Sequence, residues 1–371
     1  MTGPMEEMIR TKKIIVVCGA GGVGKTTTAT GIALAAAKQG RRVLALTVDP
    51  SKRLAQTLGV ARNLSDPTSI PEDRLQTAGI EAPGSLEAWM LDPKLVADRL
   101  VHRLSNDPEE RKRLMENRIY RGISKMIAGM QEYMAMEALH EFYRAGTYDL
   151  VVLDTPPSRN ALAFLDGPRR MSQFLDGRIF SLFVPSEERG LVRKAARHLI
   201  NRVNTLVFGE QTYGDMQEFF GSFGGILKII NSNAGKMLDL LKDDENVSFL
   251  LVTSPAKSSV DDISDFRDRT LEMGLPCAGF VLNRSQAMSS DRVFPTRDLL
   301  ENPMNACAIS GLAKLQALAK IEMAEHEQHQ ELLTQLKANV GTGAAIVTPT
   351  IPGGANEMTG LLQITASFLE Q

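Results

Sequence analysis

One segment near the start of the chain restricts its fold more than any other feature. Residues 19–26 read GAGGVGKT and match the pattern G-x-x-x-x-G-K-[ST] without a gap. A β-branched run, 14–18, precedes the segment, and a helix-forming stretch from Lys25 to Lys38 follows it. The glycines let backbone N–H groups surround an anion, and the helix N-terminus adds partial positive charge. We therefore expect a strand, a loop and a helix that together bind nucleotide phosphates.

Two side chains at the end of this loop carry the expected chemistry. Lys25 is placed to reach the β- and γ-phosphates, and the Thr26 hydroxyl is placed to coordinate Mg²⁺. A glycine-rich turn without a ligand is the alternative, but the complete pattern between a strand and a helix makes it the weaker interpretation.

The rest of the chain predicts an α/β fold. Short apolar runs alternate with helical patterns, which is typical of a mostly parallel sheet flanked by helices. The predicted strands are 14–18, 43–48, 86–91, 149–153, 248–253, 278–282 and 344–348. The predicted helices of the carboxyl-terminal part are 259–273, 308–337 and 356–370. This alternation, together with the phosphate loop, predicts a P-loop NTPase fold.

We expect residues 1–371 to form a single domain that carries a helical subdomain. Long helical patterns separate the strands at 86–91, 149–153 and 248–253, and no linker divides the chain. The subdomain is therefore predicted at approximately 95–145 and 160–245, inserted within the sheet.

The amino-acid composition indicates the cellular compartment of the protein and excludes some classes of binding partner. The chain has 42 Lys+Arg, 44 Asp+Glu and only 3 Cys. A nearly neutral net charge creates no positive electrostatic field that would attract nucleic acid. Three widely spaced cysteines are typical of a protein from a reducing compartment. The start of the chain lacks a secretory apolar region, and no run reaches the roughly 18 apolar residues of a membrane span. We expect a cytoplasmic protein that binds no nucleic acid.

Two carboxylates follow predicted strands near the phosphate loop. Asp154 ends the run at 149–153 and begins the sequence DTPPS, while Asp49 ends the run at 43–48 just before Pro50. Carboxyl ends of parallel strands meet at one edge of a sheet, so both acids should lie beside the loop. A helix cap or a turn is the alternative role for each aspartate.

Three motifs together resemble the deviant-Walker P-loop ATPases. They are GGVGKTT, VDPS after the second strand, and LDTPPS. Within that group the chain is most similar to ArsA and to the guided-entry ATPases that deliver tail-anchored proteins. Residues 86–93, 281–283 and 352–360 also resemble segments of that branch, namely the strand after the first switch, the adenine-contacting strand end and the base-covering loop.

The resemblance implies roles for individual residues. Asp49 would orient or deprotonate the attacking water, Asp154 would hold the magnesium shell, and Asn283 would read adenine. The implied ligands are ATP and Mg²⁺, and the implied assembly is a dimer that closes around two ATP molecules. The catalytic residues are then Asp49, Lys25 and Arg159; the metal ligands are Thr26, Asp49 and Asp154; the nucleotide-binding residues are Gly21, Gly22, Val23, Gly24, Lys25, Thr26, Thr27, Asn283 and Pro352.

The chain departs from the family at its signature lysine. That lysine sits one residue after the first glycine of the loop, where this chain has Ala20. Lys52, Arg53 or Arg159 is a candidate to supply the missing positive charge at the phosphates, as an arginine finger does. The alternative is that all three are solvated charges on loops. Pairing with a lysine-bearing paralogue, in a heterodimer instead of a homodimer, is a further alternative. ArsA's metalloid-binding cysteines and the eukaryotic zinc CxxC have no counterpart here, which disfavours an arsenite pump subunit.

Apolar stripes suggest a role for the helical region. Stripes within 119–134, 171–183 and 216–227 form either the core of the subdomain or a groove for the apolar helix of a client or membrane partner. Glu325, His326 and His329 do not complete an HExxH zinc motif because position 330 is Gln, so a solvated helix face is expected.

The expected function is that of a dimeric ATPase that remodels an apolar surface. A weakly hydrolysing regulatory subunit is the first alternative, supported by Ala20. A MinD- or ParA-type positioning ATPase is the second, although the segment 361–371 is neither basic nor extended.

Overall fold

The structure of the 371-residue chain is a computed structural model. It describes residues 3–48, 58–60, 66–81, 84–92, 95–96, 98–99, 102, 107–117, 120, 131–155, 209–256, 258–288, 294–299, 306–340, 343–351 and 358–370.

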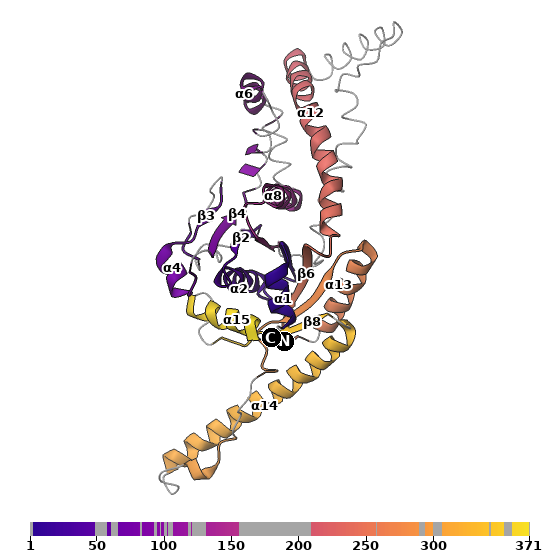
Figure 1. The fold of residues 1–371 in the computed structure, drawn as a ribbon. Helices are drawn as coiled ribbons and strands as arrows, with labels where there is room; N and C mark the ends of the chain where they lie inside the picture. Colours follow the sequence, from indigo (N-terminus) through magenta and orange to yellow (C-terminus); the bar gives the residue numbers. More distant parts are fainter. Residues whose placement is uncertain are drawn as a thin grey trace.

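A single twisted sheet of eight strands organises this part of the chain (Figure 1). The strand order is β3-β4-β2-β5-β1-β6-β7-β8, and every pair is parallel except β3 with β4. The strands are β1 (Ile14–Cys18), β2 (Arg42–Thr47), β3 (Thr68–Ser69), β4 (Ser85–Met90), β5 (Leu150–Asp154), β6 (Val247–Thr253), β7 (Cys277–Leu282) and β8 (Ala344–Val347). The central strands are buried along their whole length, which explains their continuous apolar sequences.

Helices cover both faces of the sheet. The helices are α1 (Pro4–Thr11), α2 (Lys25–Lys38), α4 (Glu72–Thr77), α6 (Pro108–Glu116), α8 (Gln131–Ala145), α12 (Glu210–Leu241), α13 (Ser259–Met273), α14 (Ala306–Val340) and α15 (Met358–Glu370), with a 3₁₀ turn η2 (Arg297–Leu299). One core cluster joins α1, α2 and α15 to one face, and a second joins α8, α12, α13 and α14 to the other. The two termini lie close together (Figure 1).

The predicted fold class is confirmed, and most predicted elements occur within one or two residues of their expected bounds. Helix α14 is longer at both ends than the predicted 308–337. Helices α1 and α4 and strand β3 were not predicted from the sequence. Helix α1 is an eight-residue helix that buries Met5, Met8 and Ile9, and β3 pairs over only two residues, so neither has a long periodic pattern.

Three described helices fall within the ranges predicted for a helical subdomain. Helix α8 packs directly on the sheet, because its buried residues belong to the same core cluster as β2 and β5. Helix α6 and much of α12 extend away from the sheet (Figure 1). Met134 and Phe219 are buried in that core, whereas the stripe at 171–183 lies outside the described residues. A separate subdomain therefore stays a prediction.

No helix within the described residues combines the length and the apolar character that a bilayer crossing requires.

Candidate nucleotide site

The glycine-rich loop joins β1 to α2 in a backbone conformation that needs its glycines. Gly24 has φ +102° and is the N-cap of α2, and a Cβ there would lie 1.9 Å from Asn283 Nδ2. Gly19 has φ +150°, and a Cβ there would lie 2.3 Å from the Val252 carbonyl oxygen. Both positions therefore exclude larger residues, through backbone strain and through lack of space. Gly21 and Gly22 are exposed, so the loop is open to solvent at its tip.

Sheet topology places an acid beside this loop. Strand β5 lies between β1 and β2, and Asp154 at its carboxyl end is in register with Val17 and Thr47. Thr26 Oγ1 donates a hydrogen bond to Asp154 Oδ2 at 2.7 Å, and Thr47 Oγ1 donates to the same oxygen at 2.9 Å. Only 2% of Asp154 is exposed. The predicted proximity of Thr26 and Asp154 is thus present in the fold.

Thr47 is a site residue that the sequence analysis missed. It ends β2 and precedes Asp49 by two residues, but a threonine in a β-branched strand carries no chemical signal of its own. Its role follows only from the pairing of β2 with β5, which brings its hydroxyl to the Asp154 carboxylate.

Lys25 lies over the loop from the first turn of α2. The residue is 5% exposed, and its Nζ donates a hydrogen bond to the carbonyl oxygen of Ala20 at 2.9 Å. This bond uses the backbone of residue 20, so it does not depend on the missing signature lysine. The ammonium group is therefore held at the loop, where incoming phosphate oxygens could replace the carbonyl as its acceptor. Thr27 follows in the same turn and is half-buried.

Asn283 connects the loop to the far half of the sheet. It follows β7, and its Nδ2 donates to the Val23 carbonyl oxygen at 2.8 Å. Its Oδ1 accepts a hydrogen bond from Thr348 Oγ1 at 2.7 Å. These bonds use one of the two N–H donors and one of the two acceptor positions of a side chain that is 3% exposed. Adenine recognition by Asn283 stays a prediction.

A thiol lies beneath the loop. Cys18 ends β1 and is fully buried, and burial raises the pKa of its thiol far above the ordinary value although the nearby Lys25 ammonium opposes the shift. The neutral thiol packs in the core and is not a nucleophile.

The donor set beside the loop suits a hard divalent cation. A threonine hydroxyl and an aspartate carboxylate are oxygen ligands of the kind that Mg²⁺ prefers. Within the described residues no group of three or more His, Cys, Asp or Glu side chains could hold a metal ion. His326 and His329 instead contact the backbone of Gln286 through their Nδ1 atoms, at 2.7 and 3.0 Å.

Several predicted site residues fall outside the described part of the chain. They are Asp49, Lys52, Arg53, Arg159 and Pro352. Their predicted roles in hydrolysis, charge compensation and base covering therefore stay predictions.

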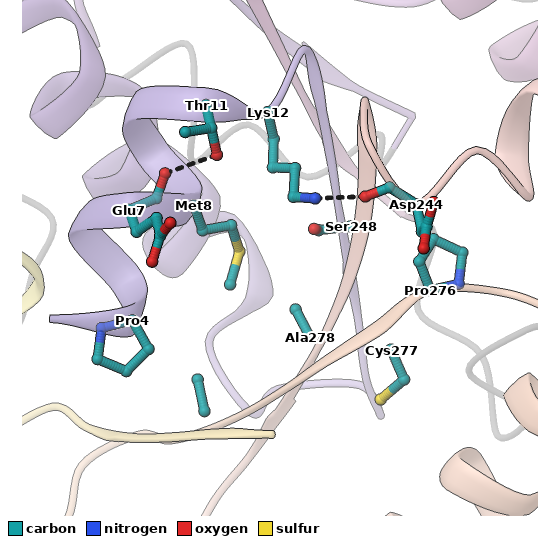
Figure 2. Close-up of a pocket in the computed structure, with 11 residues that line it drawn as sticks. Pro4, Glu7, Met8, Thr11, Lys12, Asp244, Ser248, Pro276, Cys277 and Ala278 are labelled. Atoms are coloured by element: carbon teal, nitrogen blue, oxygen red, sulfur yellow. Dashed lines mark hydrogen bonds between the residues drawn. The ribbon is translucent and has the colours of Figure 1, made fainter. Parts of the chain in front are cut away.

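A separate hollow of about 480 Å³ lies at the opposite edge of the sheet (Figure 2). It is bounded by α1 and by the amino-terminal ends of β6, β7 and β8. Lys12 Nζ donates to the Asp244 carbonyl oxygen across its rim, and Thr11 Oγ1 donates to the Glu7 carbonyl oxygen within α1 (Figure 2). Because nucleotides bind at the carboxyl ends of such strands, this hollow is not the phosphate site.

The sequence of the chain matches a known family over most of its length. Residues 12–301 match the family described as anion-transporting ATPase, also called ArsA ATPase. The chain belongs to this ArsA ATPase family. Its membership confirms the resemblance to ArsA and the guided-entry ATPases.

Individual relatives support the same assignment. "ATPase ASNA1 homolog 1" of Paramecium tetraurelia is 32% identical over 173 residues, which cover 45% of this chain and 47% of the relative. "Putative arsenical pump-driving ATPase 1" of Aquifex aeolicus is 25% identical over 225 residues, which cover 59% of this chain and 52% of the relative. "ATPase get3" of Schizosaccharomyces pombe is 26% identical over 191 residues, which cover 50% of this chain and 53% of the relative. The chain spans about half the length of these curated relatives.

Proposed function

We propose that this ArsA ATPase family member binds ATP with Mg²⁺ and hydrolyses it. The observation that carries the proposal is the pair of hydroxyls, from Thr26 and Thr47, that hold the buried Asp154 carboxylate beside the phosphate loop. The names of the relatives, which describe ATPases, support it. Magnesium, when bound, would supply positive charge next to the phosphates, with Thr26 and Asp154 as its protein ligands.

The chain's own residues would perform the remaining steps. Backbone N–H groups of the loop and the N-terminus of α2 would bind phosphate oxygens, and Lys25 would exchange its Ala20 carbonyl partner for the terminal phosphates. Asp49 would orient or deprotonate the attacking water. One of Lys52, Arg53 and Arg159 would replace the missing signature lysine.

The work of the ATPase would be conformational. We propose that the protein acts as a homodimer, or as a heterodimer with a paralogue, and that nucleotide state rearranges the helices of the predicted subdomain. Strand β5 supports this coupling, because it ends at the nucleotide site and also packs against α8. The proposed client is the apolar helix of a protein or membrane partner.

ATP turnover of the purified full chain tests the proposal. We expect steady turnover by the wild type, binding without turnover by Asp49→Asn, and loss of both in Lys25→Ala. Lys38→Ala is the matched control, because this exposed lysine ends the same helix far from the loop. Binding is measured with a fluorescent ATP analogue.

The failures of this experiment are distinguishable. Binding without turnover by the wild type would favour the regulatory subunit and would direct the search to a lysine-bearing paralogue. Absence of binding would overturn the proposal. The turnover of Lys52→Ala, Arg53→Ala and Arg159→Ala then identifies which residue replaces the signature lysine. Full turnover in all three variants would contradict the hypothesis that one of them does.

A further inference from the structure

A buried threonine fixes the orientation of the Asn283 side-chain amide. Asn283 Nδ2 donates a hydrogen bond to the Val23 carbonyl oxygen at 2.8 Å, and Thr348 Oγ1 donates to Asn283 Oδ1 at 2.7 Å. A backbone carbonyl only accepts hydrogen bonds, so the amide NH₂ must face Val23 and the amide oxygen must face Thr348. Thr348 is fully buried and Asn283 is 3% exposed, so bulk water would not replace a lost partner.

The backbones of these two residues are held by the ends of neighbouring strands. Thr348 follows β8, and its N–H donates to the Leu282 carbonyl oxygen at 3.1 Å. The Thr348 carbonyl oxygen accepts a hydrogen bond from the Ser285 N–H at 2.9 Å. The Asn283 N–H donates to the Thr253 carbonyl oxygen at 2.8 Å. Because both backbones are fixed, the Thr348 hydroxyl decides which way the Asn283 amide is turned.

The Asn283 amide acts on the peptide that joins Val23 to Gly24. In a trans peptide the carbonyl and the following N–H point in opposite directions. Because the Val23 carbonyl is bound by Asn283, the Gly24 N–H points away from Asn283. The sheet order places Asn283, after β7, and Asp154, at the end of β5, on opposite sides of β1 and its loop. A reversed peptide would turn a partially negative carbonyl toward a bound anion and would remove an N–H donor.

We propose that Thr348 is a positioning residue for phosphate binding by the loop. It orients the Asn283 amide, and this amide holds the Val23–Gly24 peptide with its N–H directed toward the phosphates. The inference rests on the proposed function, because it requires that the loop binds nucleotide phosphates. It differs from the predicted adenine contact of Asn283, because a clamp on the loop acts on the phosphates and not on the base.

Inorganic triphosphate, which has no base, separates these two roles of Asn283. Calorimetry of the full chain measures the binding of triphosphate and of a non-hydrolysable ATP analogue, each with Mg²⁺. We expect Thr348→Val, which keeps the shape and removes the donor, to weaken the binding of both ligands about tenfold. Thr348→Ser retains the hydroxyl and should restore binding to within about twofold of wild type. Thr348→Ala replaces the Val variant if circular dichroism shows that the latter does not fold.

A double-mutant cycle tests whether Thr348 acts through Asn283. Asn283→Ala should also weaken triphosphate binding about tenfold, since it removes the bond to Val23. Adding Thr348→Val to Asn283→Ala should cause no further loss, because the residue that Thr348 orients is already absent. Losses that add in the combined variant would overturn the proposal.

Thr270→Val is the matched control for the loss of a buried threonine hydroxyl. Thr270 is fully buried on α13, where its Oγ1 donates to the carbonyl oxygens of Phe266 and Arg267. Its substitution should lower stability in urea and leave the affinity for triphosphate unchanged. A purely structural role of Thr348 would give the same result as this control.

The remaining outcomes distinguish this inference from the proposed function. Wild-type affinity for triphosphate in Thr348→Val would overturn the inference and leave the proposed function standing. Weaker binding of the ATP analogue alone would also overturn it, in favour of adenine recognition by Asn283. A wild-type chain that binds neither ligand would overturn both.

Discussion

At the scale of single residues, the site depends on hydroxyls that hold a buried carboxylate. Asp154 Oδ2 accepts hydrogen bonds from Thr26 and Thr47, and a buried carboxylate is costly without such donors. We predict that Thr47→Val, which keeps the shape but removes the donor, lowers the free energy of unfolding by about 1–3 kcal/mol. Urea unfolding measures this change, and Thr47→Ser is the control that keeps the hydroxyl. Equal stability of the Val and Ser variants would contradict the role of this bond.

A second prediction at this scale separates backbone strain from lack of space in the loop. Gly24→Ala strains a φ of +102° and forces the new Cβ against Asn283, whereas Gly22→Ala strains a φ of +82° with no atom within 4 Å. We expect Gly24→Ala to weaken binding of a fluorescent ATP analogue at least tenfold more than Gly22→Ala, because displacing Asn283 breaks its bond to Val23. Similar losses in both variants would show that strain alone decides.

At the scale of elements, a buried polar contact joins α8 to α12. Glu137, 1% exposed, accepts hydrogen bonds from Tyr133 Oη at 3.2 Å and from Asn233 Nδ2 at 3.3 Å. We predict that Glu137→Ala lowers the free energy of unfolding by about 2–4 kcal/mol, since it removes an acceptor and creates a cavity. Glu137→Gln retains an acceptor and should cost less. Urea unfolding compares the stability of the two variants. An equal loss of stability in both would show that the negative charge of Glu137, and not its volume or its acceptor atoms, is responsible.

An ion pair links the amino-terminal ends of β2 and β5. The Arg42 guanidinium donates to Asp149, with Nη2 and Oδ1 2.8 Å apart, and these hydrogen bonds hold the pKa of Asp149 below its ordinary value of 3.8. A lowered folded-state pKa adds stability above the unfolded-state pKa, and this stability is lost as the pH falls toward the folded-state value. We predict that Asp149→Asn lowers the urea midpoint at pH 7 and that its difference from wild type shrinks below pH ~4. A difference that is constant with pH would contradict this.

At the scale of the whole molecule, both core clusters share one sheet. Trp89, the single tryptophan, is 2% exposed in the cluster that contains α8 and α12. If residues 1–371 form one domain, its fluorescence and the far-ultraviolet circular dichroism should change together during urea unfolding. An earlier change in circular dichroism would show that the helices outside the sheet unfold as a separate unit, which contradicts a single domain.

Local signals made much of this fold predictable. Continuous apolar runs such as 14–18 and 248–253 predicted the central strands, because strands buried on both faces need no alternation. The glycine pattern predicted the loop, because only glycine adopts its backbone angles. Helices α1 and α4 and strand β3 were missed, because elements of two to eight residues are too short to show a periodic pattern.

The sequence by itself determined the phosphate loop, the buried strands and the family, since each is written in consecutive residues. Only the tertiary structure decided which side chains meet. Strand β5 enters the sheet between β1 and β2, far from both in sequence, and this order alone gives Asp154 its Thr47 partner. Pairing between distant segments depends on the packing free energy of the whole chain, which no local pattern contains.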